Sequence, residues 1–427
     1  MPLTDLSGRM AEYLPAGALA LIDRVTEAAR KKRKRLYLVG GVVRDLLLGR
    51  PCLDIDLVLE GDAINLSETV GADGGACKLT VHPAFGTATL KGDGFALDLV
   101  TARRETYSRP GALPEVTPSN LNDDLYRRDF TVNAMAIPLT GRQRGRLIDP
   151  WGGQADIENR LIRVLHDNSF VDDATRILRA MRYEQRLAFK LEDSTEFLLK
   201  RDVSRLDTIS GDRIRHELDR IFEEQHPELV LHRGGQFDVW KRLHPALKGN
   251  NWIADSFHRA REMLRPTPIA LYYALFLYRL NEDEASQALN RLDAPKLTTK
   301  VVLDTVTLKD SLGPMSADGL KASQIYSDLR DLSGPSIIAN IIASPDPAVS
   351  KPLTLYLEKL RYVKPCLRGD DLVRMGASPG PAVGELLSKL HRAKLDGEVS
   401  NKADEVKMVR TLLPGHAIRK GKRGKRK

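Results

Sequence analysis

Two aspartates, Asp54 and Asp56, stand two residues apart in the apolar stretch LDIDLVLEG. Because side chains alternate along a β-strand, this spacing places both carboxylates on one face, with Leu53, Ile55 and Leu57 on the other. Two adjacent carboxylates repel each other unless a cation lies between them, and an open site with oxygen ligands suits Mg²⁺. Such ions support phosphoryl transfer. A surface strand with two solvated acids has the same pattern, so the pair alone leaves both interpretations open.

A glycine turn precedes the paired aspartates. Gly40 and Gly41 lie between a predicted strand (36–39) and a predicted helix (42–48), where bare backbone can approach a phosphate and free N–H groups favour anions. Arg44, one turn into that helix, could reach a triphosphate. An ordinary strand-to-helix turn would also accept two glycines. Glycines, arginine and acids within 17 residues together favour a site that binds a nucleoside triphosphate and transfers a nucleotidyl group.

Two further segments carry candidate polar groups. Asp98, in the predicted strand FALDLV, is either a third acid near the metals or simply a polar strand position. The segment DLYRRDFTVNAMA (124–136) brings together Arg127, Arg128 and Asp129. We interpret it as the start of a helix that lines a polar pocket, with a salt-bridged helix cap as the structural alternative.

The segment SFVDDATRILRAMRYEQRLAF (169–189) predicts one helix. Asp173 and Arg176 fall on neighbouring faces of it, and Arg179 and Arg182 continue the row. A surface ion pair worth about 0.2–0.5 kcal/mol is the simplest interpretation. A carboxylate acceptor beside a guanidinium donor, however, matches the amino donor and ring-nitrogen acceptor of cytosine and adenine. Guanine and uracil present the reverse order, and each unpaired buried polar group costs about 1–3 kcal/mol. The pair therefore predicts acceptance of C and A and rejection of G and U.

The elements that must position these residues change in kind along the chain. Strand patterns at 36–39, 53–59 and 76–100, with a hairpin in TATLKGDGFALDLV, alternate with helical patterns up to about residue 140. From about residue 155 onward, helical patterns dominate. We therefore expect an α+β head, a small mixed sheet with helices, followed by an all-helical body.

Composition narrows the class of protein. The 427 residues suggest several domains, and the net charge of +9 favours a polyanionic partner, although many basic proteins bind none. Cys52, Cys77 and Cys366 have neither metal-ligand nor disulfide spacing, which predicts a cytoplasmic protein. No run of about 18 apolar residues predicts a membrane span. The N-terminal stretch carries its acids before its basic run KKRKR (31–35), the wrong order for a secretory signal.

The motifs GGVVRDLLLG with DIDLV, RRDFTVNAMA, IDPWGGQADI and DDATRILRAMRYEQRLAF occur in this order. In them the chain resembles the class II tRNA nucleotidyltransferases, the CCA-adding enzymes, and their relatives the bacterial poly(A) polymerases. ISGDRIRHEL (209–218) is similar to the next helical motif of that family. The resemblance covers roughly residues 30–225. It implies an α+β nucleotidyltransferase head with tRNA, ATP and CTP as partners; neither a protein partner nor a membrane is inferred.

By this resemblance, Asp54 and Asp56 are the catalytic residues and bind Mg²⁺, and Gly41 and Arg44 hold the triphosphate. The residues implied for recognition of the nucleotide are Arg128, Asp129, Asp173, Arg176, Arg179 and Arg182. Arg128 and Asp129 would contact the incoming nucleotide and its ribose. Asp173 and Arg176 would be the amino-acid template for C and A, supported by Arg179 and Arg182. The family usually has Glu-Asp at the start of this motif, whereas this chain has Asp172-Asp173.

The sequence patterns and the resemblance together predict a domain order, an all-α neck, body and tail after the head. It is an N-terminal helix (1–30), a catalytic head (31–150), a helical neck with the base-selecting motif (151–225), a tRNA-binding helical body and tail (226–415) and a disordered basic tail (416–427). Residues 101–124 lie where the family has a mobile loop. Full CCA addition, CC or A addition alone, and poly(A) synthesis all remain open. A catalytically inactive RNA-binding protein and a nucleotidyltransferase for small molecules are the rivals from other classes.

Overall fold

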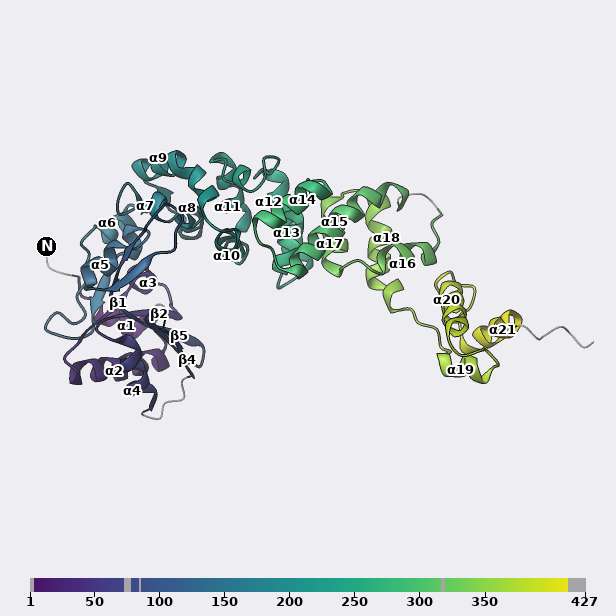
Figure 1. Cartoon of the computed structure of the whole chain (residues 1–427), viewed down its shortest axis with the longest axis horizontal. Coiled ribbons are helices and arrows are strands. Elements are labelled where there is room, and N and C mark those ends of the chain that lie inside the picture. Colours follow the sequence, from purple (N-terminus) through teal and green to yellow (C-terminus); the bar gives the residue numbers. More distant parts are fainter. Residues whose placement is uncertain (1–3, 73–77, 84–85, 316–318, 414–427) are drawn as a thin grey trace, which may run out of the picture. The chain divides into compact units, whose positions relative to one another are not determined.

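The computed structural model describes residues 4–72, 78–83, 86–315 and 319–413. By its contacts the chain divides into two compact units (Figure 1). The first is Met1–Asn251 with Arg291–Asp293, and the second is Trp252–Asn290 with Ala294–Lys427. The basic tail expected at 416–427 lies outside the described residues.

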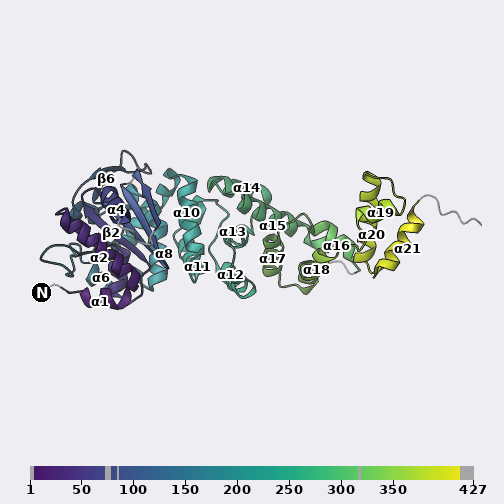
Figure 2. The same cartoon turned by 90° about the horizontal axis from the view of Figure 1, so that it is seen from below.

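The first unit is built on a six-stranded sheet with the order β3-β4-β5-β2-β1-β8. Its strands are β1 (Arg35–Val39), β2 (Asp54–Glu60), β3 (Lys78–His82), β4 (Thr87–Gly92), β5 (Phe95–Thr101) and β8 (Ala136–Pro138). Figure 2 shows strand β2 of this sheet among the helices of the unit. β2 and β5 run parallel, and the other neighbours run antiparallel. The predicted mixed sheet and the β4–β5 hairpin are therefore confirmed. Two smaller sheets pair β6 (Arg103–Thr106) with β7 (Glu115–Pro118), and β9 (Leu161–Ile162) with β10 (Lys190–Leu191).

Helices α2 and α4 pack against each other and against the sheet, and helices dominate after it. The α-helices of this unit are α1 (Ser7–Tyr13), α2 (Ala16–Lys31), α3 (Gly41–Leu47), α4 (Ala63–Ala72), α5 (Leu121–Tyr126), α6 (Gly153–Glu158), α7 (Ser169–Asp172), α8 (Thr175–Leu187), α9 (Asp193–Asp202), α10 (Gly211–Phe222) and α11 (Pro227–Gln236). Short 3-10 turns are η2 (Thr131–Asn133), η3 (Val203–Thr208) and η4 (Trp240–Arg242).

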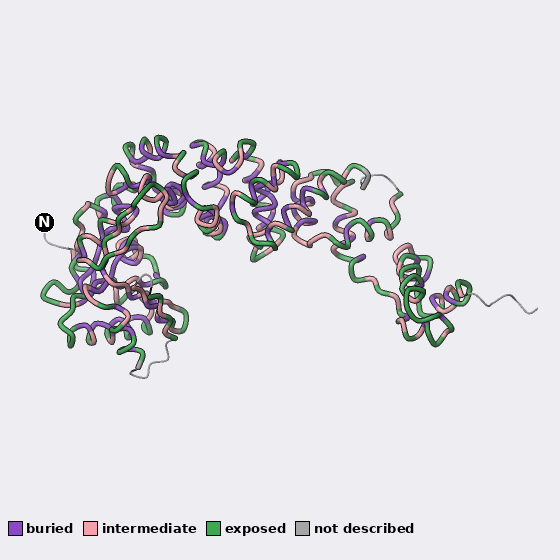
Figure 3. Tube along the Cα trace, in the orientation of Figure 1, coloured by how far each residue is buried: buried purple, intermediate pink, exposed green. Residues whose placement is uncertain are grey.

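The second unit is helical in all its described elements. They are α12 (Asn251–Met263), α13 (Ile269–Leu277), α14 (Glu282–Arg291), α15 (Lys296–Met315), α16 (Ala322–Leu329), α17 (Gly334–Ala343), α18 (Pro347–Glu358), η5 (Leu360–Tyr362), α19 (Gly369–Arg374), α20 (Pro381–Leu395) and α21 (Lys402–Leu412). Figure 3 shows buried and exposed stretches alternating along the helices, the pattern of amphipathic elements. In the described part of the chain, every helix is too short or too polar to cross a lipid bilayer.

Strand β2 carries the paired acids on one face, as the alternation predicts. Ile55 and Leu57 are buried, whereas Asp54 is exposed and Asp56 half-buried. Leu53 departs from the prediction, because β2 begins only at Asp54 and the Leu53 side chain is 55% exposed.

Two predicted helices differ from the observed ones. The segment 124–136 was expected to start a helix, and this is wrong: α5 ends at Tyr126, and the charged residues follow its end. The buried Asp124 carboxylate accepts hydrogen bonds from both Arg127 and Arg128 just beyond the helix, so the segment forms the salt-bridged helix end that was the structural alternative.

The predicted single helix over 169–189 is also wrong, because it breaks into α7 and α8 at Asp173. Asp173 is extended, with φ −138° and ψ 102°. Its Oδ1 accepts hydrogen bonds from the backbone N–H and the hydroxyl of Thr175, at 2.9 and 2.7 Å. The side chain thus satisfies a free donor at the start of α8, as an N-terminal helix cap does.

Candidate active site

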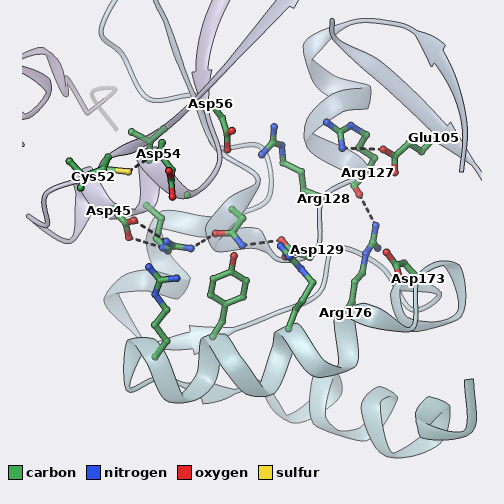
Figure 4. Close-up of a pocket in the computed structure, with 18 of the residues that line it drawn as sticks. Asp45, Cys52, Asp54, Asp56, Glu105, Arg127, Arg128, Asp129, Asp173 and Arg176 are labelled. Atoms are coloured by element: carbon green, nitrogen blue, oxygen red, sulfur yellow. Dashed lines mark hydrogen bonds and ion pairs between the residues drawn. The ribbon is translucent and has the colours of Figure 1, made fainter. Parts of the chain in front are cut away.

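A pocket of about 700 Å³ in the first unit gathers nine of the ten predicted site residues (Figure 4). They are Gly41, Arg44, Asp54, Asp56, Arg128, Asp129, Asp173, Arg176 and Arg179. Arg182 does not line this pocket. Its buried guanidinium instead donates to Glu217 and Glu224, at 3.5 and 3.2 Å. The strand, the turns and the helix that carry these residues therefore meet at one place.

The paired acids lie beside the turn that ends β1. Gly40 has φ +80°, and a Cβ added there would lie 2.5 Å from Arg128 Nη1 and 3.5 Å from Asp56 Oδ2. Only glycine lets this backbone pass so close to both side chains. Burial raises the pKa of Asp56, the Arg128 guanidinium lowers it, and the carboxylates of Asp98 and Asp54 raise it further. A second cation beside these acids would relieve that repulsion.

Asp98 pairs with Asp56 across β2 and β5, and its Oδ1 accepts a hydrogen bond of 2.6 Å from the Thr89 hydroxyl. Within the described residues, no group of three or more His, Cys, Asp or Glu side chains could hold a metal ion. The Thr89 hydroxyl thus pairs with Asp98, and the Asp98 carboxylate also lies close enough to Asp56 to raise the pKa of that group. Two carboxylates, Asp54 and Asp56, still fit Mg²⁺, which usually takes one or two protein carboxylates and completes its shell with water and substrate phosphates.

Arg44 is a buried part of the pocket lining, 3% exposed. Its Nε and Nη2 donate to the Asp45 carboxylate at 2.9 and 3.0 Å, and its Nη1 donates to Asn133 Oδ1 at 2.7 Å. Burial lowers the pKa of Arg44, but Asp45 and Tyr183 outweigh it and raise that pKa overall. The guanidinium therefore stays charged and is held in one orientation.

The buried Asp129 forms an ion pair with the partly buried Arg179 of α8. Arg179 donates from Nε and Nη2 to Asp129 Oδ2, at 2.9 and 2.6 Å, while Asn133 donates to Oδ1 at 3.0 Å. Burial raises the pKa of Asp129, but Arg179 and Asn133 outweigh it and lower the pKa to about 2. The carboxylate is therefore ionised in the folded protein at neutral pH.

This pair predicts a pH dependence of stability. The pKa of Asp129 is about 2 when folded, below the ordinary value of 3.8, so its stabilisation is present above pH 3.8 and lost as the pH falls toward 2. In Asp129→Asn, the urea midpoint should fall less between pH 5 and pH 3 than in the wild type. The pH-dependent part of the free energy of unfolding that this variant lacks is on the order of 2 kcal/mol over the full titration of Asp129. Asp93→Asn, in the exposed β4–β5 turn, is the control. An equal decrease of the urea midpoint between pH 5 and pH 3 in Asp129→Asn and in the wild type would contradict the ion pair.

Asp173 and Arg176 both line the pocket, but each has a different partner from the one expected. Asp173 Oδ1 accepts a hydrogen bond of 2.7 Å from Arg213 of α10. Arg176, in the first turn of α8, donates to the Ser169 hydroxyl at 2.8 Å and to the Arg127 carbonyl oxygen at 2.6 Å. The surface ion pair between Asp173 and Arg176 is therefore not formed. Because the described hydrogen bonds of Asp173 all use Oδ1, its Oδ2 is available to a ligand.

Several lining residues were missed from the sequence. Tyr183 is the most central, because its ring centroid lies 5.2 Å from the Arg44 guanidinium carbon and 5.5 Å from that of Arg179. Helical spacing could have found it, since Tyr183 stands four residues after Arg179 and seven after Arg176. Asn133, the other central residue, links Arg44 to Asp129 through one hydrogen bond to each.

The segment 101–124, expected to match a mobile loop, contains the antiparallel ribbon of β6 and β7. At its pocket side, Glu105 Oε1 accepts a hydrogen bond of 3.2 Å from Arg127, and Oε2 accepts one of 3.0 Å from the Tyr107 hydroxyl. Glu105 and Tyr107 line the pocket beside Asp173 and Arg176. The pocket therefore combines two acids at the start of β2 with several guanidinium groups, which suits an anionic substrate and a divalent cation.

Two family models match the first unit. One is described as "Poly A polymerase head domain" and matches residues 36–163, and the other as "Probable RNA and SrmB- binding site of polymerase A" and matches residues 188–249. The "A-adding tRNA nucleotidyltransferase" of Halalkalibacterium halodurans is 33% identical over 414 residues, covering 96% of each chain. Relatives with the same name in Geobacter sulfurreducens and Aquifex aeolicus are longer, and this chain covers 48% and 45% of their length.

Solved structures of similar fold carry related names. A CCA-adding enzyme in an apo form matches with a TM-score of 0.81 at 32% identity, over 97% of this chain and all of that one. A CCA-adding enzyme in complex with ATP matches with a TM-score of 0.79 at 31% identity, over 96% and 100% of the two chains. The Thermotoga maritima CCA-adding enzyme complexed with tRNA matches with a TM-score of 0.76 at 32% identity, over 96% and 100%.

Proposed function

The chain belongs to the tRNA nucleotidyltransferases, and we propose that it adds A, C or both to the 3′ end of tRNA from ATP and CTP. The observation that carries this proposal is the gathering of nine predicted residues in one pocket. The 3′-hydroxyl of tRNA attacks the α-phosphate of the bound nucleotide. The bond from the α-phosphate to the bridging oxygen breaks, and pyrophosphate leaves.

The arginines of the pocket bind and orient the triphosphate. Arg44 is held by Asp45 and Asn133, and Arg128 by the buried Asp124, so both cations are fixed before the substrate arrives. Fixed donors that face a developing negative charge are the general source of stabilisation in phosphoryl transfer. Asp56 lies beside Arg128, since a Cβ on Gly40 would meet both side chains, and this supports placing the triphosphate next to the paired acids.

The family uses a divalent metal, and we propose Mg²⁺ held by Asp54 and Asp56. When bound, the ion supplies a lower pKa for the attacking hydroxyl and positive charge for the triphosphate. The half-buried Asp56, whose pKa is raised by burial and by two neighbouring carboxylates, supports a cation at this position.

Base selection is assigned to Asp173 and Arg176. Asp173 Oδ2 accepts from the amino group of adenine or cytosine, while Arg176 donates to the adjacent ring nitrogen. Both side chains are pre-oriented by other partners: Asp173 by Arg213 and Thr175, and Arg176 by Ser169. In guanine and uracil, the carbonyl oxygen would face the Asp173 carboxylate and the ring N–H would face the Arg176 guanidinium, so neither group could form a hydrogen bond. Selection by protein side chains requires no nucleic-acid template.

Addition of the terminal A is the reaction favoured by the relative that matches 96% of the chain and is named A-adding. Full CCA addition is the second candidate, favoured by the CCA-adding structure with a TM-score of 0.81. The division into N-terminal helix, head, neck, body with tail and basic tail remains part of the proposal, as does a cytoplasmic location.

The experiment uses the purified protein with Mg²⁺ and three tRNAs that end at the discriminator base, at C and at CC. Each receives ATP, CTP or both, and products are sized to one nucleotide. One A added to the CC-ended tRNA alone establishes an A-adding enzyme, and CCA added to the shortest tRNA establishes a CCA-adding enzyme. A stop at CC indicates a CC-adding enzyme. A long ladder of A would replace the proposal with a poly(A) polymerase.

A further inference from the structure

A second pocket of the first unit, of about 650 Å³, is strongly basic. Its charged lining residues are all cations: Arg30, Arg33, Lys34, Arg35 and Arg142. Among the described residues that line it, none is an aspartate or a glutamate. It shares no lining residue with the candidate active site. We call it the basic pocket.

The fold builds the basic pocket from two distant parts of the sequence. Helix α2 ends at Lys31, and a tight turn through Arg33 (φ +54°) leads into β1. Four successive cations, residues 32–35, follow the helix end, and the last three of them line the pocket. Arg142 comes from the loop after β8, the strand that pairs with β1. The Thr140 hydroxyl ties this loop to the turn, because it accepts from the Leu36 N–H and donates to the Lys34 carbonyl.

The basic pocket and the catalytic acids lie at opposite ends of the same two strands. β1 runs antiparallel to β2, with Arg35 opposite Glu60, whereas Asp54 stands at the other end of β2. Six residue steps of a strand span about 20 Å. An RNA end held in the active site therefore leaves this surface open to another part of the same RNA, or to a second one.

The cations of the basic pocket are poorly neutralised by the protein. Within the described residues, Arg33, Lys34 and Arg142 make no ion pair. Arg30 and Arg35 have only long contacts, at 3.9 Å to Glu27 and 3.8 Å to Glu60, with half or more of each arginine side chain exposed. Exposed ion pairs of this kind contribute little to the free energy of folding, so they leave both arginines available to an anionic partner. Arg30 lies in the last turn of α2, where a cation stabilises the helix, and this gives it a structural role. Arg33, Lys34 and Arg142 lie outside α2.

The lining indicates recognition of phosphates and not of bases. Tyr37 is the aromatic residue of the lining, and it is only 7% exposed, so its ring offers no face for a base to stack on. Exposed arginines and lysines that contact phosphates position a nucleic acid without reading its sequence. We propose that the basic pocket binds successive backbone phosphates of an RNA, outside the catalytic pocket. This site goes beyond the proposed reaction and does not depend on which nucleotide is added.

The test measures binding of the full-length protein to a fluorescein-labelled tRNA ending in CC and to a labelled 20-nucleotide oligouridylate, by anisotropy between 50 and 300 mM KCl. Lys34→Glu and Arg142→Glu are each expected to weaken binding of at least one RNA by about 3–10-fold near 150 mM salt. Each should also reduce the slope of log affinity against log salt by about 1. Lys31→Glu is the matched control, because Lys31 belongs to the same basic run but does not line the pocket.

Lys34→Glu and Arg142→Glu should both keep the wild-type rate of nucleotide incorporation at saturating tRNA, which separates this inference from the proposed function. Unchanged affinity and salt slope for both RNAs would overturn it. An equal loss of RNA affinity in Lys31→Glu would also overturn it, because it would mean that RNA responds to the overall positive charge and not to a defined site. Loss of binding to inorganic tripolyphosphate alone, measured by calorimetry with RNA binding intact, would overturn it in favour of a small polyphosphate ligand.

Discussion

Asp54→Ala and Asp56→Ala should each lower the rate of nucleotide incorporation by about three orders of magnitude or more. We propose the two carboxylates as ligands of the ion, and loss of about 4 kcal/mol of transition-state stabilisation corresponds to about 10³ in rate. Binding of tRNA should stay within about twofold of wild type. The rate is measured by single-turnover incorporation of labelled ATP into a tRNA ending in CC.

Asp98→Asn is the internal control for these variants. Asp98 stands opposite Asp56 in β5, but its carboxylate is already hydrogen-bonded to Thr89, and we expect a loss of less than about tenfold. Wild-type activity in Asp54→Ala would remove the metal site from these acids. An equally large loss in Asp98→Asn would make Asp98 a third catalytic acid. A wild type inactive with Mg²⁺ would favour the RNA-binding protein without catalysis.

Replacement of Asp173 by alanine should remove most of the preference for A and C. The carboxylate is the acceptor for the exocyclic amino group, and a buried donor left unpaired costs about 1–3 kcal/mol, or about 5–150-fold in kcat/KM for ATP. The same change removes the mismatch with guanine. The ratio of kcat/KM for ATP to that for GTP should therefore fall by more than kcat/KM for ATP itself.

Asp172→Ala is the matched variant, because Asp172 precedes Asp173 but does not line the pocket. Its carboxylate lies 3.8 Å from His166, and we expect its ATP-to-GTP ratio to stay close to wild type. The Asp173 assignment fails if both variants keep the wild-type ratio. It also fails if Asp172→Ala changes the ratio as much as Asp173→Ala does.

The part of the site that lies on β2 could be predicted from local pattern alone. Strand alternation orients Asp54 and Asp56 together, and the positive φ of Gly40 explains why glycine stands beside them. Asp173 shows the limit of such patterns. Helical periodicity extended the helix through Asp173, whereas its side chain satisfies the start of α8 and thereby breaks the helix there.

Contacts between distant segments could not be predicted from spacing. Arg213 holds Asp173 across forty residues, and Arg179 holds Asp129 across fifty, so the partners of both acids depend on how α8 and α10 pack. The same holds for the basic pocket, where the run at 31–35 gives no sign that Arg142 joins it. In both cases the sequence identified one side of the contact, Asp173 or the run at 31–35, and only tertiary packing supplied the partner, Arg213 or Arg142.

The most direct measurement compares the four nucleoside triphosphates, one at a time, on wild-type protein with Mg²⁺ and a tRNA ending in CC. Side-chain selection by Asp173 and Arg176 predicts incorporation of ATP into this tRNA, and of CTP into a tRNA ending at the discriminator base if the enzyme also adds C. It predicts kcat/KM values for GTP and UTP lower by about 10² or more, since at least two buried polar groups would be left unpaired. Comparable incorporation of GTP or UTP would contradict selection of the base by these side chains.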